Sequence, residues 1–387
     1  MGWGFVEAIS KHHDLWVITE KKKFESEIEA ELEKQPELRK RIKFYYIPKT
    51  RHRTLRKIWP PSYYWFYKAW QKKAFTLGAK LHKEIGFDII HQLNMVGFRE
   101  PGYLWKLDSH FVWGPIGGMG ILGWRFLTML GFYGYFYHLG KNIINLFQMR
   151  YSKRPRKAVS EAKALIAATP DTHDTMKRIW DVESEIICEV GPPSRIVSEH
   201  SIRKEDEPLR LVWSGLHVPR KALNLLIIAL SSLPEKVKWS VDILGKGPRT
   251  NAWKKQADEL RISRRCNFHG WVPRDKAVST IANSHLFIMT SLADLTSTVL
   301  LEALSQGVPV ICLDHCGFSH LVTKNCGIKI PVKSPSQVTT DIALAIENLW
   351  NDETSRQKLA EGALERAKDF SWDKKVEVLN GIYQEAI

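Results

Sequence analysis

Two acidic residues precede an apolar, strand-like run near residue 310. The stretch SLADLTSTVLLEALSQGVPVICLD covers residues 291–314 and places Asp294 and Glu302 eight positions apart. Between them, a polar start for a helix over STVLLEALSQ is supplied by Thr296, Ser297 and Thr298. Helical rise would separate the carboxylates by roughly 10 Å, which suits a sugar at one end, a ribose at the other and a diphosphate between. The alternative is that Asp294 caps the helix and Glu302 pairs with a neighbouring base.

Cations and glycines follow two other predicted strands. SGLHVPRKAL (214–223) puts Gly215 at a strand end and Arg220 and Lys221 at the entry to the next helix. LGKGP (244–248) ends the following strand with Gly245 and Gly247, which either let backbone approach a ligand or simply form a turn. Ligands in open α/β sheets bind outside the carboxyl ends of the strands, so we expect both cations to meet one diphosphate.

The elements that must position these residues alternate along the C-terminal half. Strands are predicted at LRLVWSG, KWSVDILG, CNFHGWV, LFIMTS, PVICLD and GIKIPV, and helix-length patterns separate most of them. This alternation predicts a doubly wound parallel sheet. The N-terminal half alternates less clearly, with strands at LWVITE, FYYIP, FDIIHQLN, FVWGPIGG, ALIAATP and SEIICEVG, and it predicts a second α/β domain.

The domain boundary falls in GPPSRIVSEHSIRKEDEPLR (191–210), where prolines and charges occur without periodicity. We therefore predict an N-terminal domain over 1–195 and a C-terminal domain over 196–370, followed by a last helix over 371–387. The chain opens directly on the helical pattern MGWGFVEAISKHH, where an α/β domain normally opens with a strand and a glycine-rich turn. A first strand is therefore expected to be missing from the N-terminal sheet.

The charge of the chain is unevenly distributed. The 387 residues carry a net charge of +15, and residues 1–200 hold 32 Lys and Arg against 21 Asp and Glu. The segment 38–83 has fourteen basic residues, no acidic ones and interleaved aromatic residues. Such a surface suits polyanions or an anionic membrane, or it is simply a solvated helical face. No nucleic-acid-binding motif accompanies the charge, so a nucleic-acid partner is not expected.

The cysteines, the N-terminal residues and the most apolar segment further restrict the class of protein. The five cysteines are odd in number and lack C-x-x-C spacing, so reduced core residues are expected in place of disulfides or a metal site. The first fifteen residues are interrupted by charges, and no secretory signal is predicted. The most apolar segment, 121–147, carries Arg125, Lys141 and four glycines, which fits an interfacial or substrate-facing helix better than a membrane-spanning one. Cytoplasmic localisation follows, with a peripheral contact to the inner face of the membrane left open.

Taken together, these motifs resemble the retaining, family 4 type (group 1) glycosyltransferases of the GT-B fold, in the branch that builds surface polysaccharides. The resemblance rests on Gly215 and Lys221 after a strand, the G-x-G-P turn at 245–248, FHGWVP (268–273), and the E-x7-E spacing of Asp294 and Glu302 followed by GVPV. It implies two Rossmann-like domains facing a cleft. Three departures stand out: Asp294 where the family usually has Glu, Leu216 where Arg commonly follows the glycine, and His320 where an acid often stands.

The resemblance also implies roles for the donor-side residues. Glu302 would hydrogen-bond the ribose of a nucleotide-sugar, Lys221 would bind its diphosphate, and the 294–298 loop would touch sugar and phosphate, with Asp294 as a catalytic residue. Arg220 would replace the cation lost at Leu216. A hexosyl transfer needing neither a divalent metal nor a cofactor beyond the donor is expected, because these cations can stabilise the leaving diphosphate.

On the acceptor side, FDIIHQLN (87–94), VWGPIGG (112–118) and AATP (167–170) look like the acceptor domain of the same family. His91 is assigned a catalytic position, and the cleft would be lined by Gly114, Gly117 and Gly118. The alternative for His91 is a structural histidine at a strand end. FSWDKKVEVLNGIYQEAI (370–387) resembles the family's terminal helix, which crosses back to the first domain.

The expected reaction is sugar transfer from a nucleotide diphosphate sugar to a growing glycan or a polyprenyl-diphosphate-linked acceptor, with retention of configuration. Two alternatives stay open at this point. A nucleotide-sugar epimerase on the same fold would consume no acceptor, and a non-catalytic GT-B scaffold would bind the donor without turnover.

Overall fold

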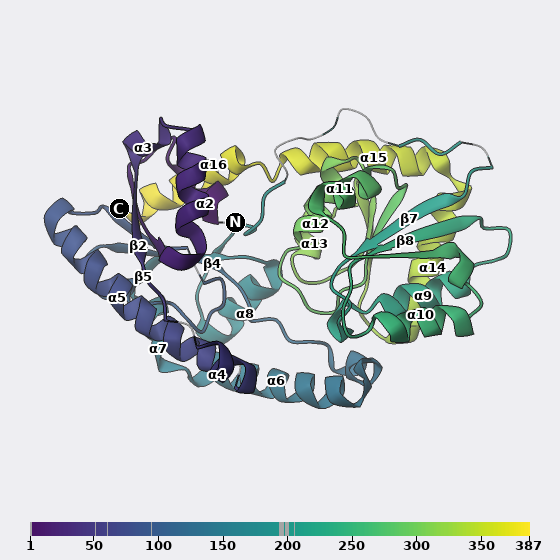
Figure 1. Ribbon diagram of the computed structural model, residues 1–387, viewed down its shortest axis with the longest axis horizontal. Coiled ribbons are helices and arrows are strands. Elements are labelled where there is room, and N and C mark those ends of the chain that lie inside the picture. Colours follow the sequence, from purple (N-terminus) through teal and green to yellow (C-terminus); the bar gives the residue numbers. More distant parts are fainter. Residues whose placement is uncertain are drawn as a thin grey trace.

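The computed structural model describes residues 2–50, 52–59, 61–93, 95–192, 197, 201–204 and 206–387. The chain forms two α/β domains side by side, with the N-terminal domain on the left of Figure 1 and the C-terminal domain on the right. All strand pairs in the described residues are parallel. The predicted α/β class with two Rossmann-like domains is confirmed.

The C-terminal domain is built on one sheet with strand order β12-β11-β10-β7-β8-β9 in the described residues. The strands are β7 (Leu209–Ser214), β8 (Trp239–Leu244), β9 (Cys266–Gly270), β10 (Leu286–Met289), β11 (Val310–Leu313) and β12 (Gly327–Ile330). The helices are α9 (Leu223–Ser231), α10 (Thr250–Glu259), α11 (Arg274–Ala282), α12 (Thr298–Ser305), α13 (Phe318–Leu321), α14 (Pro335–Asn351) and α15 (Glu353–Lys368). Apolar strand residues on the two sides of the sheet enter two separate core clusters, so helices cover both faces.

The N-terminal domain carries two smaller sheets. β1 (Leu15–Glu20) pairs with β2 (Ile42–Ile47), and a second sheet has the order β3-β4-β5-β6. Its strands are β3 (Ile89–Gln92), β4 (His110–Ile116), β5 (Ala162–Ala167) and β6 (Glu185–Ile186). The helices around them are α1 (Gly2–Ile9), α2 (Lys21–Lys34), α3 (Leu38–Arg41), α4 (Arg53–Ile58), α5 (Ser62–Ile85), α6 (Gly131–Tyr151), α7 (Lys153–Glu161) and α8 (Pro170–Trp180).

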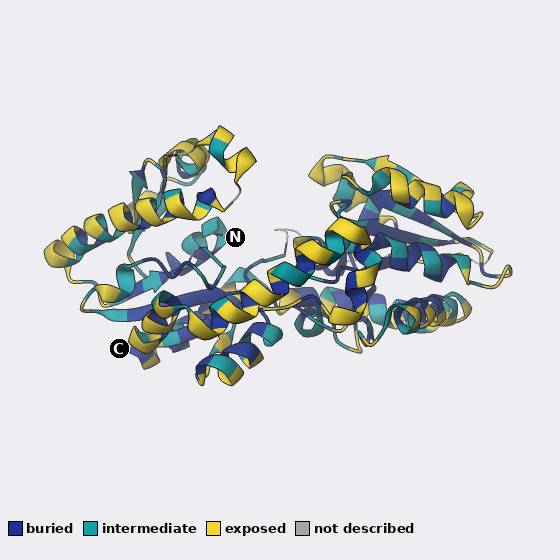
Figure 2. Cartoon of the chain, turned by 90° about the horizontal axis from the view of Figure 1, so that it is seen from below, coloured by how far each residue is buried: buried dark blue, intermediate teal, exposed yellow. Residues whose placement is uncertain are grey.

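Short 3₁₀ turns complete the chain: η1 (Leu104–Lys106), η2 (Trp124–Leu130), η3 (Pro219–Lys221) and η4 (Ser263–Arg265). The strand expected over SEIICEVG is paired only at Glu185 and Ile186, because after them the chain leaves the sheet edge for the other domain. Buried residues concentrate on the strands inside each domain, and exposed residues lie on the outer helices (Figure 2).

The last helix, α16 (Trp372–Ala386), packs on the N-terminal domain. Leu379 and Ile382 share one core cluster with Phe5 of α1 and Val112 of β4. The Trp372 ring meets the Phe5 ring edge-on, with centroids 5.0 Å apart. Because α15 packs on the C-terminal sheet through α12, the α15–α16 segment joins the two domains by a second connection besides residues 191–208.

A histidine fastens α16 to the sheet. The Nε2 atom of His91, in β3, lies 2.8 Å from the Gly114 carbonyl oxygen, and its Nδ1 lies 2.7 Å from the Tyr383 hydroxyl of α16. A carbonyl oxygen can only accept, so Nε2 carries the proton and the Tyr383 hydroxyl donates to Nδ1. Burial lowers the pKa of His91 to about 4, which keeps the ring neutral and this pattern intact.

The pH dependence of stability should therefore report on His91. The unfolded chain protonates this residue near the ordinary pKa of about 6.5, whereas the folded protein resists protonation until about pH 4. Between these values the unfolded state binds more protons, so acidification is predicted to lower the free energy of unfolding. The loss from this residue amounts to at most about 1.4 kcal/mol per pH unit.

Chemical denaturation of the native protein and of His91→Gln, measured between pH 7 and pH 5, tests this prediction. Glutamine keeps an N–H donor for the Gly114 carbonyl but does not titrate, so the variant should lose less stability on acidification. The other histidines contribute equally to both proteins. Identical slopes would contradict the assigned protonation state.

Candidate active site

The predicted donor residues gather at the carboxyl edge of the C-terminal sheet. The strand order reverses at β7, since β8 and β9 extend the sheet on one side while β10, β11 and β12 extend it on the other. Gly215 follows β7, Gly245 follows β8, and Asp294 follows β10. Such a reversal point is where open α/β sheets bind ligands, because neighbouring loops diverge there and leave a crevice.

Asp294 holds two cations at this edge. The Lys221 ammonium contacts Asp294 Oδ2, and the Arg220 guanidinium lies 3.6 Å from Oδ1. Arg220 also donates to the Ala293 carbonyl at 2.6 Å, and the Leu292 N–H donates to the Arg220 carbonyl at 2.7 Å. The turn that carries both cations is therefore fixed to the loop after β10. Both positive charges lie beside the Asp294 carboxylate.

Glycine is required by the turn after β8. Gly245 has φ +112°, and a Cβ atom there would lie 1.9 Å from the Gly215 carbonyl oxygen. A Cβ at Gly247 would lie 2.6 Å from the His217 carbonyl oxygen. These contacts are too short for any side chain, so the turns after β7 and β8 stay pressed together beside the cations.

The start of α12 contributes backbone donors. Ser297 occupies the N-cap position with extended dihedral angles, and within the described residues its side chain makes no capping hydrogen bond. The Thr296 N–H before it donates to Glu189 Oε1 of the N-terminal domain at 3.0 Å. Thr298 begins the helix. The uncapped first turn leaves the positive end of the helix dipole directed at the same edge as Arg220 and Lys221.

Glu302 faces a different cation. Arg274, the first residue of α11, places its Nε 2.8 Å from Glu302 Oε1. The Glu302 side chain is 8% exposed, whereas that of Arg274 is 64% exposed. The two acids of the motif thus stand in two separate ion pairs. Arg274 was not anticipated from the sequence, because nothing local relates it to a residue 28 positions later.

The acceptor-side glycines lie between β4 and the other domain. A Cβ atom at Gly117 would lie 2.4 Å from the Leu295 side chain, so this glycine borders the 294–298 loop directly. Gly118 has φ +77°, and a Cβ at Gly114 would lie 2.4 Å from the Ile166 carbonyl. His91 contacts these glycines by its hydrogen bond to the Gly114 carbonyl. Its other ring nitrogen is hydrogen-bonded to the Tyr383 hydroxyl.

The departures from the family pattern are visible in the structure. Leu216 is 60% exposed and offers no charge, and the cation on this side of the site is Arg220. The His320 carbonyl accepts from Arg366 at 2.6 Å, and burial lowers the pKa of its imidazole. The position where the family often carries an acid therefore presents a neutral ring.

A second interdomain contact was missed by the sequence reasoning. The Cys316 N–H donates to Asp171 Oδ2 of α8 at 2.7 Å, and His315 Nε2 lies 2.8 Å from the Ser291 carbonyl. The ligand-type atoms of Asp171, His315 and Cys316 lie within 4.8 Å of one another. Burial raises the pKa of the Cys316 thiol to about 12, so the thiol is protonated at neutral pH. These groups act as a hydrogen-bonded clasp between the domains.

The family comparison agrees with this geometry. Residues 196–366 match the family described as glycosyl transferases group 1, and this range contains Gly215, Arg220, Lys221, Asp294 and Glu302. The lipopolysaccharide core biosynthesis glycosyltransferase LpsE of Rhizobium meliloti (strain 1021) is 26% identical over 202 residues. That match covers 51% of this chain and 56% of LpsE, so the similarity spans little more than half of the relative.

Solved structures extend the likeness of fold to the whole chain. The lipopolysaccharide outer core galactosyltransferase WaaB is 14% identical with a TM-score of 0.65, covering 97% of this chain and all of that one. HepE of Anabaena, solved in complex with UDP, is 14% identical with a TM-score of 0.61, covering 98% of this chain and 95% of that one. The architecture is GT-B throughout, and the predicted resemblance is confirmed over residues 196–366, which match the glycosyl transferases group 1 family.

Proposed function

We propose that the protein transfers a sugar from a nucleotide diphosphate sugar to a glycan or lipid-linked acceptor in surface polysaccharide synthesis. The observation that carries this proposal is the cation pair Arg220 and Lys221 facing the start of α12 at the strand reversal. A diphosphate placed there would meet two fixed positive charges and backbone donors at once. The names of LpsE and WaaB support the polysaccharide context, and the UDP bound to HepE supports a uridine nucleotide as the first donor to test.

The proposed chemistry uses electrostatic stabilisation of the departing diphosphate. Negative charge builds on the bridging oxygen as its bond to the sugar breaks, and Lys221 with Arg220 would take up that charge. Before the donor binds, Asp294 pairs with both cations and offsets one of their two positive charges. The incoming diphosphate would replace this partner and leave Asp294 beside the sugar. Because protein cations fill the charge-stabilising role, the proposal calls for no divalent metal.

The remaining predicted residues take supporting roles in this proposal. Glu302, oriented by Arg274, would hydrogen-bond the ribose hydroxyls. Gly114, Gly117 and Gly118 would let the acceptor approach the sugar, and a side chain at Gly117 would fill the space toward Leu295. His91 would contribute to catalysis by holding the Gly114 carbonyl in place. Transfer of the sugar on the same face, with retention of configuration, is part of the proposal.

The acceptor is proposed to reach this site from a membrane surface. Helix α6 buries a polar face and exposes an apolar one: His138, Asn142 and Asn145 are buried, whereas the exposed residues include Phe132, Tyr133, Phe136, Tyr137, Ile143, Ile144, Phe147 and Tyr151. Water-facing helices normally show the reverse. Exposed apolar rows of this size mark a contact with a partner or a lipid interface.

The charge near this helix favours an anionic lipid surface as the partner. Ile58, Trp59 and Trp65 of the α4–α5 region are also exposed, within the segment that lacks acidic residues. In Figure 1, α4 and α6 both lie along the lower border of the view. The helices of the described chain lack the length and apolar content needed to cross a bilayer. Contact would therefore be made by side chains that enter the interface, with lysine and arginine near the headgroups.

Donor binding is predicted to depend on both ion pairs. Calorimetric titration with UDP-, GDP- and ADP-sugars should show tight binding of one donor, weakened at least about a hundredfold in Lys221→Ala and about tenfold in Glu302→Ala, since charged hydrogen bonds contribute about 1.5–3 kcal/mol. Lys238→Ala is the matched control. It removes an exposed lysine at the opposite edge of the same sheet and should bind as the native protein does.

Product analysis of the same samples separates transfer from its rivals. Transfer to an added glycan acceptor, unaffected by EDTA, supports the proposal. An isomerised donor without acceptor consumption would indicate an epimerase. Tight binding without any turnover would indicate a scaffold. A scaffold would agree with the state of His91, because both of its ring nitrogens are hydrogen-bonded within the protein.

Membrane association is predicted to require the exposed face of α6. Co-sedimentation with vesicles of anionic phospholipid at low salt should retain the native protein, and replacing Phe132, Tyr133 and Phe147 by serine should weaken binding at least about tenfold, because each loses apolar burial. Trp271→Ser, which removes an aromatic residue 67% exposed on the other domain, is the control. Equal loss in both proteins, or no binding by the native protein, would contradict the assignment.

A further inference from the structure

Helix α6 carries a row of residues that faces the rest of the protein. Gly134, His138, Lys141, Asn145 and Gln148 follow one another at intervals of three and four residues, so they share one face of the helix. His138 and Asn145 of this row are buried, and the exposed apolar face of α6 lies on the opposite side. In Figure 1, α6 extends from the N-terminal domain toward the C-terminal domain.

One end of this row lies against the turn that carries the donor-site cations. A Cβ atom at Gly134 would lie 3.8 Å from the Cβ of Pro219, the residue before Arg220. Lys141 follows Gly134 by seven residues, which is about 10 Å along the helix axis. Reduced hydration, and then the charges of Arg220 and Arg99, lower the pKa of Lys141. Lys141 therefore lies between two other cations and within reach of the charge of each.

The other end of the row holds Arg99. The Arg99 guanidinium donates to the side-chain oxygens of Asn145 and Gln148. Asn145 also donates to the Gly118 carbonyl at 3.3 Å, so Arg99 is fixed beside the acceptor-side glycines. These two bonds use two of the five N–H groups of the guanidinium, and the others are left for a ligand.

The positive charge of this group is only partly compensated. Among the described residues, no carboxylate forms an ion pair with Arg99 or Lys141. The acid next to Arg99 in the sequence, Glu100, pairs instead with Arg154 at 2.5 Å. Asp294 is shared by the two donor-site cations. A donor diphosphate would bring its charges to that pair, and Arg99 and Lys141 would still lack an anionic partner.

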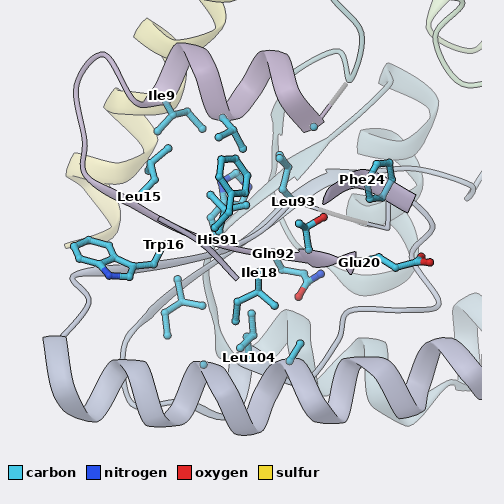
Figure 3. A pocket seen from close by; sticks show the side chains of 18 of the residues that line it. Ile9, Leu15, Trp16, Ile18, Glu20, Phe24, His91, Gln92, Leu93 and Leu104 are labelled. Carbon is cyan, nitrogen blue, oxygen red and sulfur yellow. The ribbon is translucent and has the colours of Figure 1, made fainter. Parts of the chain in front are cut away.

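The large cavity of the N-terminal domain is a separate feature. It measures about 2240 Å³, and Arg99 and Lys141 are not among the residues that line it. Most of the labelled side chains around it are apolar, such as Ile9, Ile18 and Leu104 (Figure 3). An anionic group of a ligand is therefore expected on the α6 side of the glycines, where the cations are.

We propose that Arg99 and Lys141 bind a phosphate group carried by the acceptor, in a site next to the donor diphosphate but separate from it. This inference rests on the transferase function proposed above and makes it more specific, because it requires a phosphorylated acceptor. The guanidinium, held by Asn145 and Gln148, would bind two phosphate oxygens, and the Lys141 ammonium would act as a point charge beside it.

Two kinds of acceptor share this chemistry. A lipid carrier would present a phosphate or diphosphate, and a phosphorylated glycan would present a phosphate ester. The exposed apolar face of α6 is about one helix diameter, 10 Å, from the row that contains Lys141. A lipid carrier whose chain enters the membrane beneath α6 would thus bring its phosphate close to Lys141 and Arg99.

The test measures phosphate binding apart from nucleotide binding. Hexose 1-phosphate and geranyl diphosphate are titrated by calorimetry into the full chain, with and without saturating UDP. Lys141→Gln removes the charge of a side chain that has no hydrogen bond or ion pair in the described residues, so folding contacts are kept. Lys141→Arg restores the charge. Arg150→Gln, which removes an exposed cation from the last turn of the same helix, is the matched control.

At least one probe is expected to bind the UDP-saturated protein. Lys141→Gln should weaken this binding at least tenfold, with the melting temperature not lowered and UDP affinity changed less than threefold. Lys141→Arg should bind within threefold of the native protein, and Arg150→Gln should bind as the native protein does. Binding of geranyl diphosphate alone would assign the phosphate to a lipid carrier, and binding of hexose 1-phosphate alone would assign it to a phosphorylated glycan.

Other outcomes separate this inference from the proposed function. Binding of UDP with no binding of either probe would overturn the phosphate site and leave the donor site standing. Probe binding that is lost in Lys221→Ala but kept in Lys141→Gln would also overturn it, because the anion would then occupy the donor site. Probe binding that depends on Lys141, without binding of any nucleotide, would support the phosphate site and count against the proposed donor.

Discussion

The contact of Asp294 with Arg220 and Lys221 is the interaction on which the site depends. It joins the turn after β7 to the loop after β10 at the point where the strand order reverses. Two cations held this close repel each other, and the shared carboxylate offsets that repulsion until an anion arrives. The site is thus arranged for an incoming negative charge. The turn at Gly245 packs closely against the turn after β7. The start of α12 lies at the same edge of the sheet.

The two domains are held together by a few contacts, of which only the packing of α16 was predicted from the sequence. Glu189 accepts from the Thr296 N–H, Asp171 accepts from the Cys316 N–H, and α16 packs on α1. Burial raises the pKa of Glu189, so its carboxyl group is sensitive to its surroundings. These contacts hold the 294–298 loop beside the glycines of the N-terminal domain.

The strands of the C-terminal half could be predicted from the sequence because each is specified by a contiguous apolar run. Apolar runs such as LFIMT and PVICL are long enough to name buried strands, and the residues after them necessarily reach one edge of a parallel sheet. The sequence therefore predicts that Arg220, Lys221 and Asp294 lie at one edge of the sheet. The pairing of Glu302 with Arg274 and of Asp171 with Cys316 was not predictable, because each joins segments brought together only by tertiary folding. The same holds for α6, whose period is helical but whose polar face is the buried one.

Hydrogen exchange with and without UDP tests the central claim most directly. If the strand reversal in the C-terminal sheet is the donor site, added nucleotide should protect residues 215–221, 245–248 and 291–302 and leave the amino edge of the sheet unchanged. Because UDP lacks the sugar, this pattern reports the diphosphate and nucleoside contacts alone. Protection confined to other segments, with none in these three for any nucleoside diphosphate, would contradict the assignment of the site.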